Sequence, residues 1–188
     1  DTDLAYGYLE RAQALEPFNS LVFAAFATVF ATIGRDEDAG RAWQEAIRLR
    51  PQDPGLQAEL ADFYFNRGNK EEAKTWVAKA VHLVPHDAAY RLLLARIEAS
   101  LGHIKEAEQH LRIAHQLEPE EATINFELGH LLWCCCQNPA AIRFLGKAAR
   151  AGHKEAKAFL TMINKGKGKK VRPNRLEDGG TVFEQIAY

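Results

Sequence analysis

The chain has 188 residues, of which 47% are hydrophobic and 26% are charged. This is the composition of an ordinary folded protein of one domain's length, and it excludes collagen-like, disulfide-framework and fully disordered chains. The net charge of −1 gives no reason to expect a nucleic acid as partner. The charge is unevenly spread, because residues 165–188 carry +3 and the preceding residues carry −4.

No segment is predicted to span a membrane. The most apolar stretch, residues 21–33, is shorter than the roughly 20 residues that a helical span requires. The three cysteines are adjacent, at positions 134–136, and so cannot form a disulfide framework. Their odd number favours a reducing compartment, and the sequence therefore predicts a cytoplasmic location.

An internal repeat of 34 residues decides the expected fold. Prolines recur at this interval at Pro17, Pro51, Pro85 and Pro119. Two registers of small residues and one of larger apolar residues keep the same phase: Ala5, Ala39, Ala73, Ala107 and Ala141; Ala12, Ala46, Ala80, Ala114 and Ala148; Leu9, Trp43, Val77, Leu111 and Leu145. A period of this length is the signature of stacked helix pairs, so the predicted fold class is all-α.

Turn and stop signals divide the chain into elements. In each repeat a first helix is expected to end at Gly34, Gly68 or Gly102, and a second helix to end before the proline. In chain order we expect the second helix of a truncated repeat in residues 1–19 and four helix pairs in residues 20–153. A capping helix in residues 154–164 and a basic flexible tail with an apolar tip in residues 165–188 follow.

The stretch AELADFYFNRGNKEEAKTWVAKAVHLVP resembles the tetratricopeptide repeat (TPR) family, and the resemblance extends over residues 4 to about 160. It implies a right-handed α-solenoid of antiparallel helix pairs whose first helices line a concave, partner-binding face. The last repeat departs from the family pattern, because Cys136 and His153 stand where the turn glycine and the terminal proline are expected. Its sequence looks more like the related Sel-one-like repeats, with Gly152 supplying the stop.

No catalytic constellation is found. Ser20 and Ser100 lack a nucleophile-elbow context, and Pro85 separates the one pair of histidines at helical spacing. Adjacent cysteines on a helix project about 100° apart and do not converge on a metal ion. We therefore predict a chain that is not an enzyme, with no cofactor and no metal ligand, whose cysteines serve packing.

The resemblance implies which side chains face the concave surface. At positions 5, 9 and 12 of the first helices, the side chains change from small in the first repeat to aromatic in the last. The middle repeats carry one acidic residue and one arginine at these positions. An aromatic anchor beside an arginine is typical of a binding hot spot, although packing of the aromatics against neighbouring helices stays open. The predicted partner-binding residues are Asp62, Phe65, Leu92, Arg96, Phe126, His130 and Trp133.

Three functional interpretations follow. The first is a non-enzymatic scaffold that binds a peptide or helix of a partner protein in the concave groove. The alternative is a regulatory or targeting TPR region excised from a larger enzyme or assembly protein, which the truncated first repeat favours. The third is self-association, either through an apolar N-terminal end or through the tail, whose tip at residues 181–188 would dock on a TPR surface. A chaperone-tail clamp is disfavoured, because Arg96 is the one matching basic residue.

Overall fold

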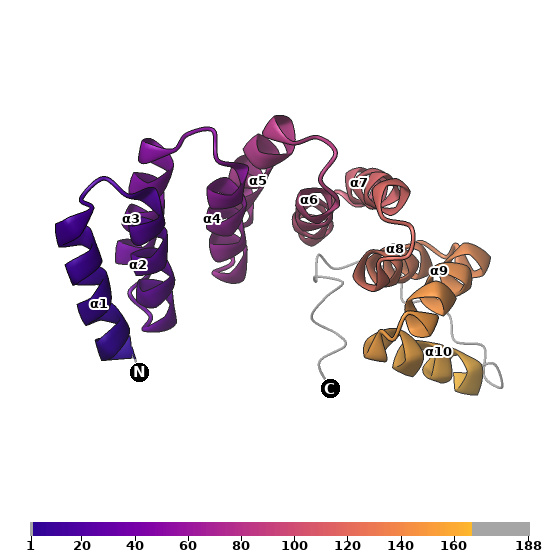
Figure 1. Cartoon of the computed structure of the whole chain (residues 1–188). Coiled ribbons are helices and arrows are strands. Elements are labelled where there is room, and N and C mark those ends of the chain that lie inside the picture. Colours follow the sequence, from indigo (N-terminus) through magenta and orange to yellow (C-terminus); the bar gives the residue numbers. More distant parts are fainter. Residues whose placement is uncertain (1, 167–188) are drawn as a thin grey trace. The chain divides into compact units, whose positions relative to one another are not determined.

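The computed structural model describes residues 2–166 of the chain, and these form α-helices without a strand (Figure 1). The helices follow one another with short connections. Their bounds are α1 Thr2–Leu15, α2 Ser20–Thr32, α3 Asp36–Leu49, α4 Pro54–Asn66, α5 Lys70–Leu83, α6 Ala88–Ser100, α7 Ile104–Leu117, α8 Ala122–Cys134, α9 Asn138–Arg150 and α10 Lys154–Gly166.

The helices fall into two compact units, the first ending at Pro85 and the second beginning at His86. In the first unit α2 packs on α3 and α4 packs on α5, while α1 packs on α2. In the second unit α6 packs on α7, α8 on α9, and α10 on α9. The all-α fold of paired helices predicted from the 34-residue period is confirmed.

Local signals set the ends of the helices. Gly34, Gly68 and Gly102 follow the first helices with φ angles of +77°, +82° and +83°, a left-handed conformation that glycine adopts without a steric penalty. The first helices begin at side-chain caps: the carboxylates of Asp53 and Asp87, for example, accept hydrogen bonds from the N–H groups of Gly55 and Tyr90.

The fourth complete repeat differs at both of its ends. Cys136 takes the left-handed position that glycine holds in the earlier repeats, with φ +61°. Gly152, with φ +99°, forms the turn before α10, in agreement with the expected stop. Helix α10 continues to Gly166, two residues beyond the predicted end, and the cationic Lys165 in its last turn complements the helix dipole there.

The two alanine registers lie where the helices approach one another. From the second repeat onward every member of both registers is fully buried, and the larger residues between them are nearly so. The closest approach is at Gly129 on α8, where an added Cβ atom would lie 2.9 Å from both Cγ and N of Leu145 on α9. The predicted tail, residues 167–188, lies outside the described residues, and so does the proposed docking of its tip.

Candidate protein-binding surfaces

A slot of about 440 Å³ lies between α2 and α4 in the first unit. We call it the α2–α4 slot. Helix α2 carries no charged residue and contributes small side chains, whereas α4 contributes two carboxylates and an amide. The residues that line the slot are Thr28, Ala31, Thr32, Trp43, Glu59, Asp62, Phe63, Asn66 and Arg67.

The carboxylates make the slot acidic. The Asn66 side-chain amide donates a hydrogen bond to Asp62 Oδ2 at 2.9 Å, which holds that carboxylate in place. Partial burial and the nearby Asp53 carboxylate raise the pKa of Glu59. Within the described residues, neither Glu59 nor Asp62 forms a salt bridge, so the slot can receive a positive charge from outside.

Arg67 fixes one end of the slot. Its Nε donates to Asp36 Oδ1 at 2.9 Å and its Nη2 donates to the carbonyl oxygen of Ala31 at 2.8 Å. The guanidinium also lies 5.6 Å from the centre of the Phe63 ring. One side chain of α4's C-cap thus ties together the ends of α2 and α3, and the wall of the slot is held before any partner arrives.

The predicted site residues of the first unit are Asp62 and Phe65. Asp62 is exposed and lines the α2–α4 slot. Phe65 is half-buried on α4 and is not part of the slot's lining. The slot also contains Glu59, which was not predicted as a site residue, because it does not lie at position 5, 9 or 12 of its helix.

In the second unit Arg96 on α6 is exposed and pairs with a buried carboxylate. Its Nε lies 3.3 Å from Oε1 of Glu127 on α8, and Glu127 is 8% exposed. Burial raises the pKa of Glu127, and the positive charge of Arg96 opposes that rise. Arg96, Glu127 and His130 border a gap of about 10 Å³, too small to admit a side chain of a partner.

The predicted aromatic residues of α8 contact α10 and the turn before it. The Phe126 ring stacks on His153 with 4.3 Å between centroids and on His130 with 5.9 Å. The Phe159 ring of α10 meets the rings of His130 and Trp133 edge-on at 5.4 and 6.0 Å. Since His130 is 5% exposed and Phe126 and Trp133 are half-buried, packing against the cap uses much of each ring.

Leu92, the remaining predicted residue, is half-buried on α6 and packs against the buried side chains of α7 and α8. His130 borders the same small gap as Arg96, and its ring also stacks on Phe126. His153 and Phe159, which complete this cluster, were not predicted as site residues, because nothing in the 34-residue register shows which side chains the cap covers.

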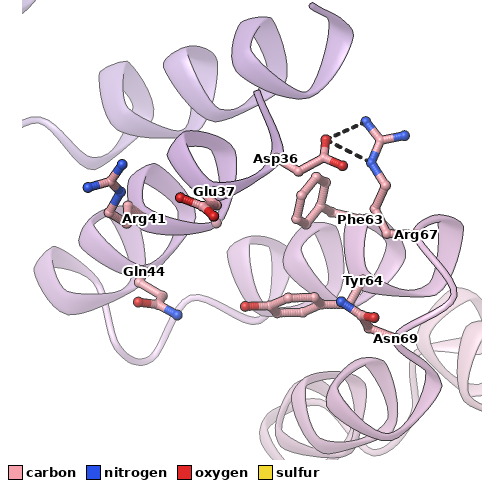
Figure 2. A pocket seen from close by; sticks show the side chains of 9 residues that line it. Asp36, Glu37, Arg41, Gln44, Phe63, Tyr64, Arg67 and Asn69 are labelled. Atoms are coloured by element: carbon pink, nitrogen blue, oxygen red, sulfur yellow. Dashed lines mark hydrogen bonds and ion pairs between the residues drawn. The ribbon is translucent and has the colours of Figure 1, made fainter. Parts of the chain in front are cut away.

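A second recess of about 620 Å³ lies in the first unit between α3 and the turn from α4 to α5 (Figure 2). We call it the α3–α5 recess. Phe63 and Tyr64 of α4 form its aromatic wall, with ring centroids 5.6 Å apart. The Tyr64 hydroxyl points toward α3, on the side of Gln44, and the Asp36–Arg67 pair stands at the other end.

The N-terminal end of the first unit is apolar and exposed. The five side chains that form this N-terminal surface are 58–83% exposed: Leu4, Tyr8, Leu15, Phe18 and Leu21. Leu4, Tyr8 and Leu15 lie on one face of α1, away from Tyr6, which packs against Phe26 at 5.6 Å. Large exposed apolar patches of this kind mark contact surfaces.

The three cysteines lie at the end of α8 and in the turn that follows it. Burial, with smaller contributions from the two neighbouring thiols, raises the pKa of Cys134 to about 11, which disfavours the thiolate. No group of three His, Cys, Asp or Glu residues in the described range could hold a metal ion. Nor does any described helix have the length and apolar character to cross a bilayer.

Stacked helix pairs with a 34-residue period, closed by a capping helix, define a TPR protein. A match to a family model defines the class more closely. The chain belongs to the family described as the Cilia and flagella-associated protein 70 C-terminal domain, whose model matches residues 1–128. Among curated protein sequences, none matches the chain.

Solved structures agree on the fold. The chain is similar to PilF of Pseudomonas aeruginosa, with 20% identity, a TM-score of 0.79, and coverage of 89% of this chain and 76% of PilF. It is similar to YrrB, described as a TPR protein with an unusual peptide-binding site, at 17% identity and TM-score 0.69, covering 86% and 84% of the two chains. A chain of the APC/C hetero-tetramer Cut9–Hcn1 matches at 17% identity and TM-score 0.72, over 87% of this chain and 34% of its own length.

Proposed function

We propose that this TPR protein is a non-enzymatic scaffold that binds a peptide or helix of a partner protein along its first helices. The observation that carries the proposal is the α2–α4 slot, in which Glu59 and Asp62 face an uncharged helix of small residues. A slot that is held open by Arg67 and has unpaired carboxylates on one side suits a basic, partly apolar segment.

The proposed partner-binding set is the one expected from the repeat register. Asp62 and Phe65 belong to it in the first unit, and Leu92 and Arg96 in the second. Phe126 and Trp133 are half-buried and contribute the parts of their rings that remain exposed. His130 is buried and stacks against the ring of Phe126. The exposed charged members of this set are Asp62 in the first unit and Arg96 in the second.

The names of similar proteins support protein partners. The family name refers to cilia and flagella, YrrB is described with a peptide-binding site, and Cut9 is described in a hetero-tetramer with Hcn1. We therefore propose a structural or assembly role in cilia or flagella. The cytoplasmic location predicted from the cysteines is retained as part of this proposal.

Affinity capture with charge-reversal variants tests the proposed function. The full chain is used as bait in an extract of ciliated cells, as wild type, as Asp62→Lys and as Glu72→Lys. Glu72 is exposed on the second helix α5, so its reversal matches the charge change outside the slot. Partners retained by wild type and Glu72→Lys but lost by Asp62→Lys support slot binding. The same partners on all three baits would contradict it.

The alternative is that the TPR array is the regulatory or targeting region of a larger enzyme or assembly protein. The description of the family as a C-terminal domain favours this version. An antibody raised against the chain and used on whole-cell extract tests it, because the alternative requires a band well above 21.1 kDa. Self-association through the N-terminal surface is the third candidate, favoured by the exposed side chains of α1.

A further inference from the structure

We propose that the α3–α5 recess is a second binding surface, which takes an extended segment of a partner protein carrying a basic side chain next to an aliphatic one. The proposal is separate from binding in the α2–α4 slot. The recess is bordered by α3 and by the α4–α5 turn, whereas the slot lies between α2 and α4, and Phe63 and Arg67 form the wall between them.

Gly40 opens the recess. At the equivalent positions of the other repeats, 34 residues apart, the chain has side chains: Tyr6, Lys74, Glu108 and Ile142. At Gly40 an added Cβ atom would meet only Tyr64 Oη, at 3.8 Å, so the space beside the Tyr64 hydroxyl has room for a side chain at this position. Glycine inside a helix costs about 1 kcal/mol relative to alanine, so its presence here is not explained by helix stability.

Three polar side chains around this space form no hydrogen bond to another described residue, so a ligand can reach their donors and acceptors. Asn69 is the N-cap residue of α5, yet its side chain makes no capping hydrogen bond. Within the described residues, the Gln44 amide and the Tyr64 hydroxyl also form no hydrogen bond, and both line the recess. A primary amide offers a donor and an acceptor together, which is what a peptide unit with free N–H and C=O groups requires. Such free groups occur along an extended segment and not inside a helix.

The charges and the aromatic wall specify the side chains of that segment. Asp36 pairs with Arg67, and Arg41, which also lines the recess, shares the Asp38 carboxylate with Arg35. Glu37 is exposed and forms no ion pair within the described residues. The first unit as a whole has thirteen acidic against nine basic side chains. A basic side chain therefore fits beside Glu37, and an aliphatic one fits against the rings of Phe63 and Tyr64.

Titration of isotope-labelled full chain with capped hexapeptides, followed by NMR, tests the proposal. The probe is SAKLAS, and the controls are SAELAS and SAKSAS, which remove the positive charge and the aliphatic side chain in turn. We expect SAKLAS to shift the Gly40 backbone amide and the side-chain amides of Gln44 and Asn69, and each control to bind at least tenfold more weakly.

Two substitutions at one position separate binding from folding. Gly40→Lys introduces the residue found at the equivalent position of the next repeat and places a long side chain at the recess, whereas Gly40→Ala adds a methyl group that fits. Both should keep or raise the melting temperature. We expect Gly40→Lys to abolish the shifts and Gly40→Ala to retain them.

The proposal would be overturned by no shift with SAKLAS, by equal shifts with SAELAS or SAKSAS, or by unchanged binding by Gly40→Lys. Shifts confined to the amides of Thr28 and Asp62 would assign the peptide to the α2–α4 slot and would equally reject a site in the recess. Because the slot and the recess report through different amides, failure of this proposal is distinguishable from failure of the proposed function.

Discussion

Cys136 occupies, in the fourth complete repeat, the left-handed backbone position that Gly102 occupies in the third, with φ angles of +61° and +83°. A side chain at such a position costs about 1–2 kcal/mol, because Cβ approaches the carbonyl oxygen. Cys136 is exposed, so no buried contact offsets this strain. The turn between α8 and α9 is therefore a local weak point of the second unit.

We predict that Cys136→Gly raises the free energy of unfolding by about 1 kcal/mol, since relief of the strain exceeds the added freedom of the unfolded chain. The denaturant midpoint measures the change. Cys136→Ser serves as the control, because it removes the thiol and keeps the Cβ atom. Equal midpoints for the glycine and serine variants would show that Cys136 is unstrained.

A second prediction concerns Gly129. Its Cα faces α9 so closely that a methyl group would overlap Leu145, including its backbone nitrogen. We expect Gly129→Ala to lower the free energy of unfolding by about 1–3 kcal/mol through overpacking. Gly146→Ala is the matched control in α9, since its Cβ would meet only the flexible end of Arg150, at 3.7 Å, and alanine favours the helix. If Gly129→Ala and Gly146→Ala had the same free energy of unfolding, the close approach of α8 and α9 at Gly129 would be contradicted.

The repeat register in the sequence predicts some features of the structure and not others. Gly34, Gly68 and Gly102 gave the ends of the first helices because capping depends on a few neighbouring residues. The register could not predict that Phe126 and Trp133 contact α10, because that contact depends on how a helix outside the repeat packs. The signal for the α3–α5 recess was present as the missing side chain at Gly40, but only the structure shows that the space stays unfilled.

The Arg96–Glu127 pair gives a pH-dependent prediction. Arg96→Ala leaves a buried carboxylate without its cation, which we expect to cost about 1–3 kcal/mol at neutral pH. Burial raises the pKa of folded Glu127 above its unfolded value, and loss of Arg96 raises it further. Ionisation of Glu127 therefore lowers stability as the pH rises through the folded pKa, and the cost of the mutation is smallest in acid.

Urea unfolding of Arg96→Ala between pH 4 and 7, compared with wild type, measures this dependence. The double variant Arg96→Ala with Glu127→Gln is the control, because glutamine carries no charge to desolvate. We expect the double variant to lose the added pH dependence. A mutational cost that is the same at both pH values would mean that Glu127 is not the group responsible.

The N-terminal surface predicts self-association of this chain. Exposed Tyr8 and Leu15 lie on one face of α1, at 67% and 83% exposure. We expect Tyr8→Glu with Leu15→Lys to reduce the dimer fraction at high protein concentration, because charges on this face oppose burial. Sedimentation velocity measures the fraction. A wild-type chain that is monomeric at the highest soluble concentration would exclude an interface here.

Hydrogen exchange of the full chain, alone and saturated with a captured partner, tests the scaffold proposal most directly. Binding along the first helices requires new protection of the exposed faces of α2 and α4 in the first unit, with Asp62→Lys abolishing the protection and Glu72→Lys retaining it. Protection confined to α3 and α5, or protection that Asp62→Lys leaves intact, would contradict the proposal that partners bind in the α2–α4 slot.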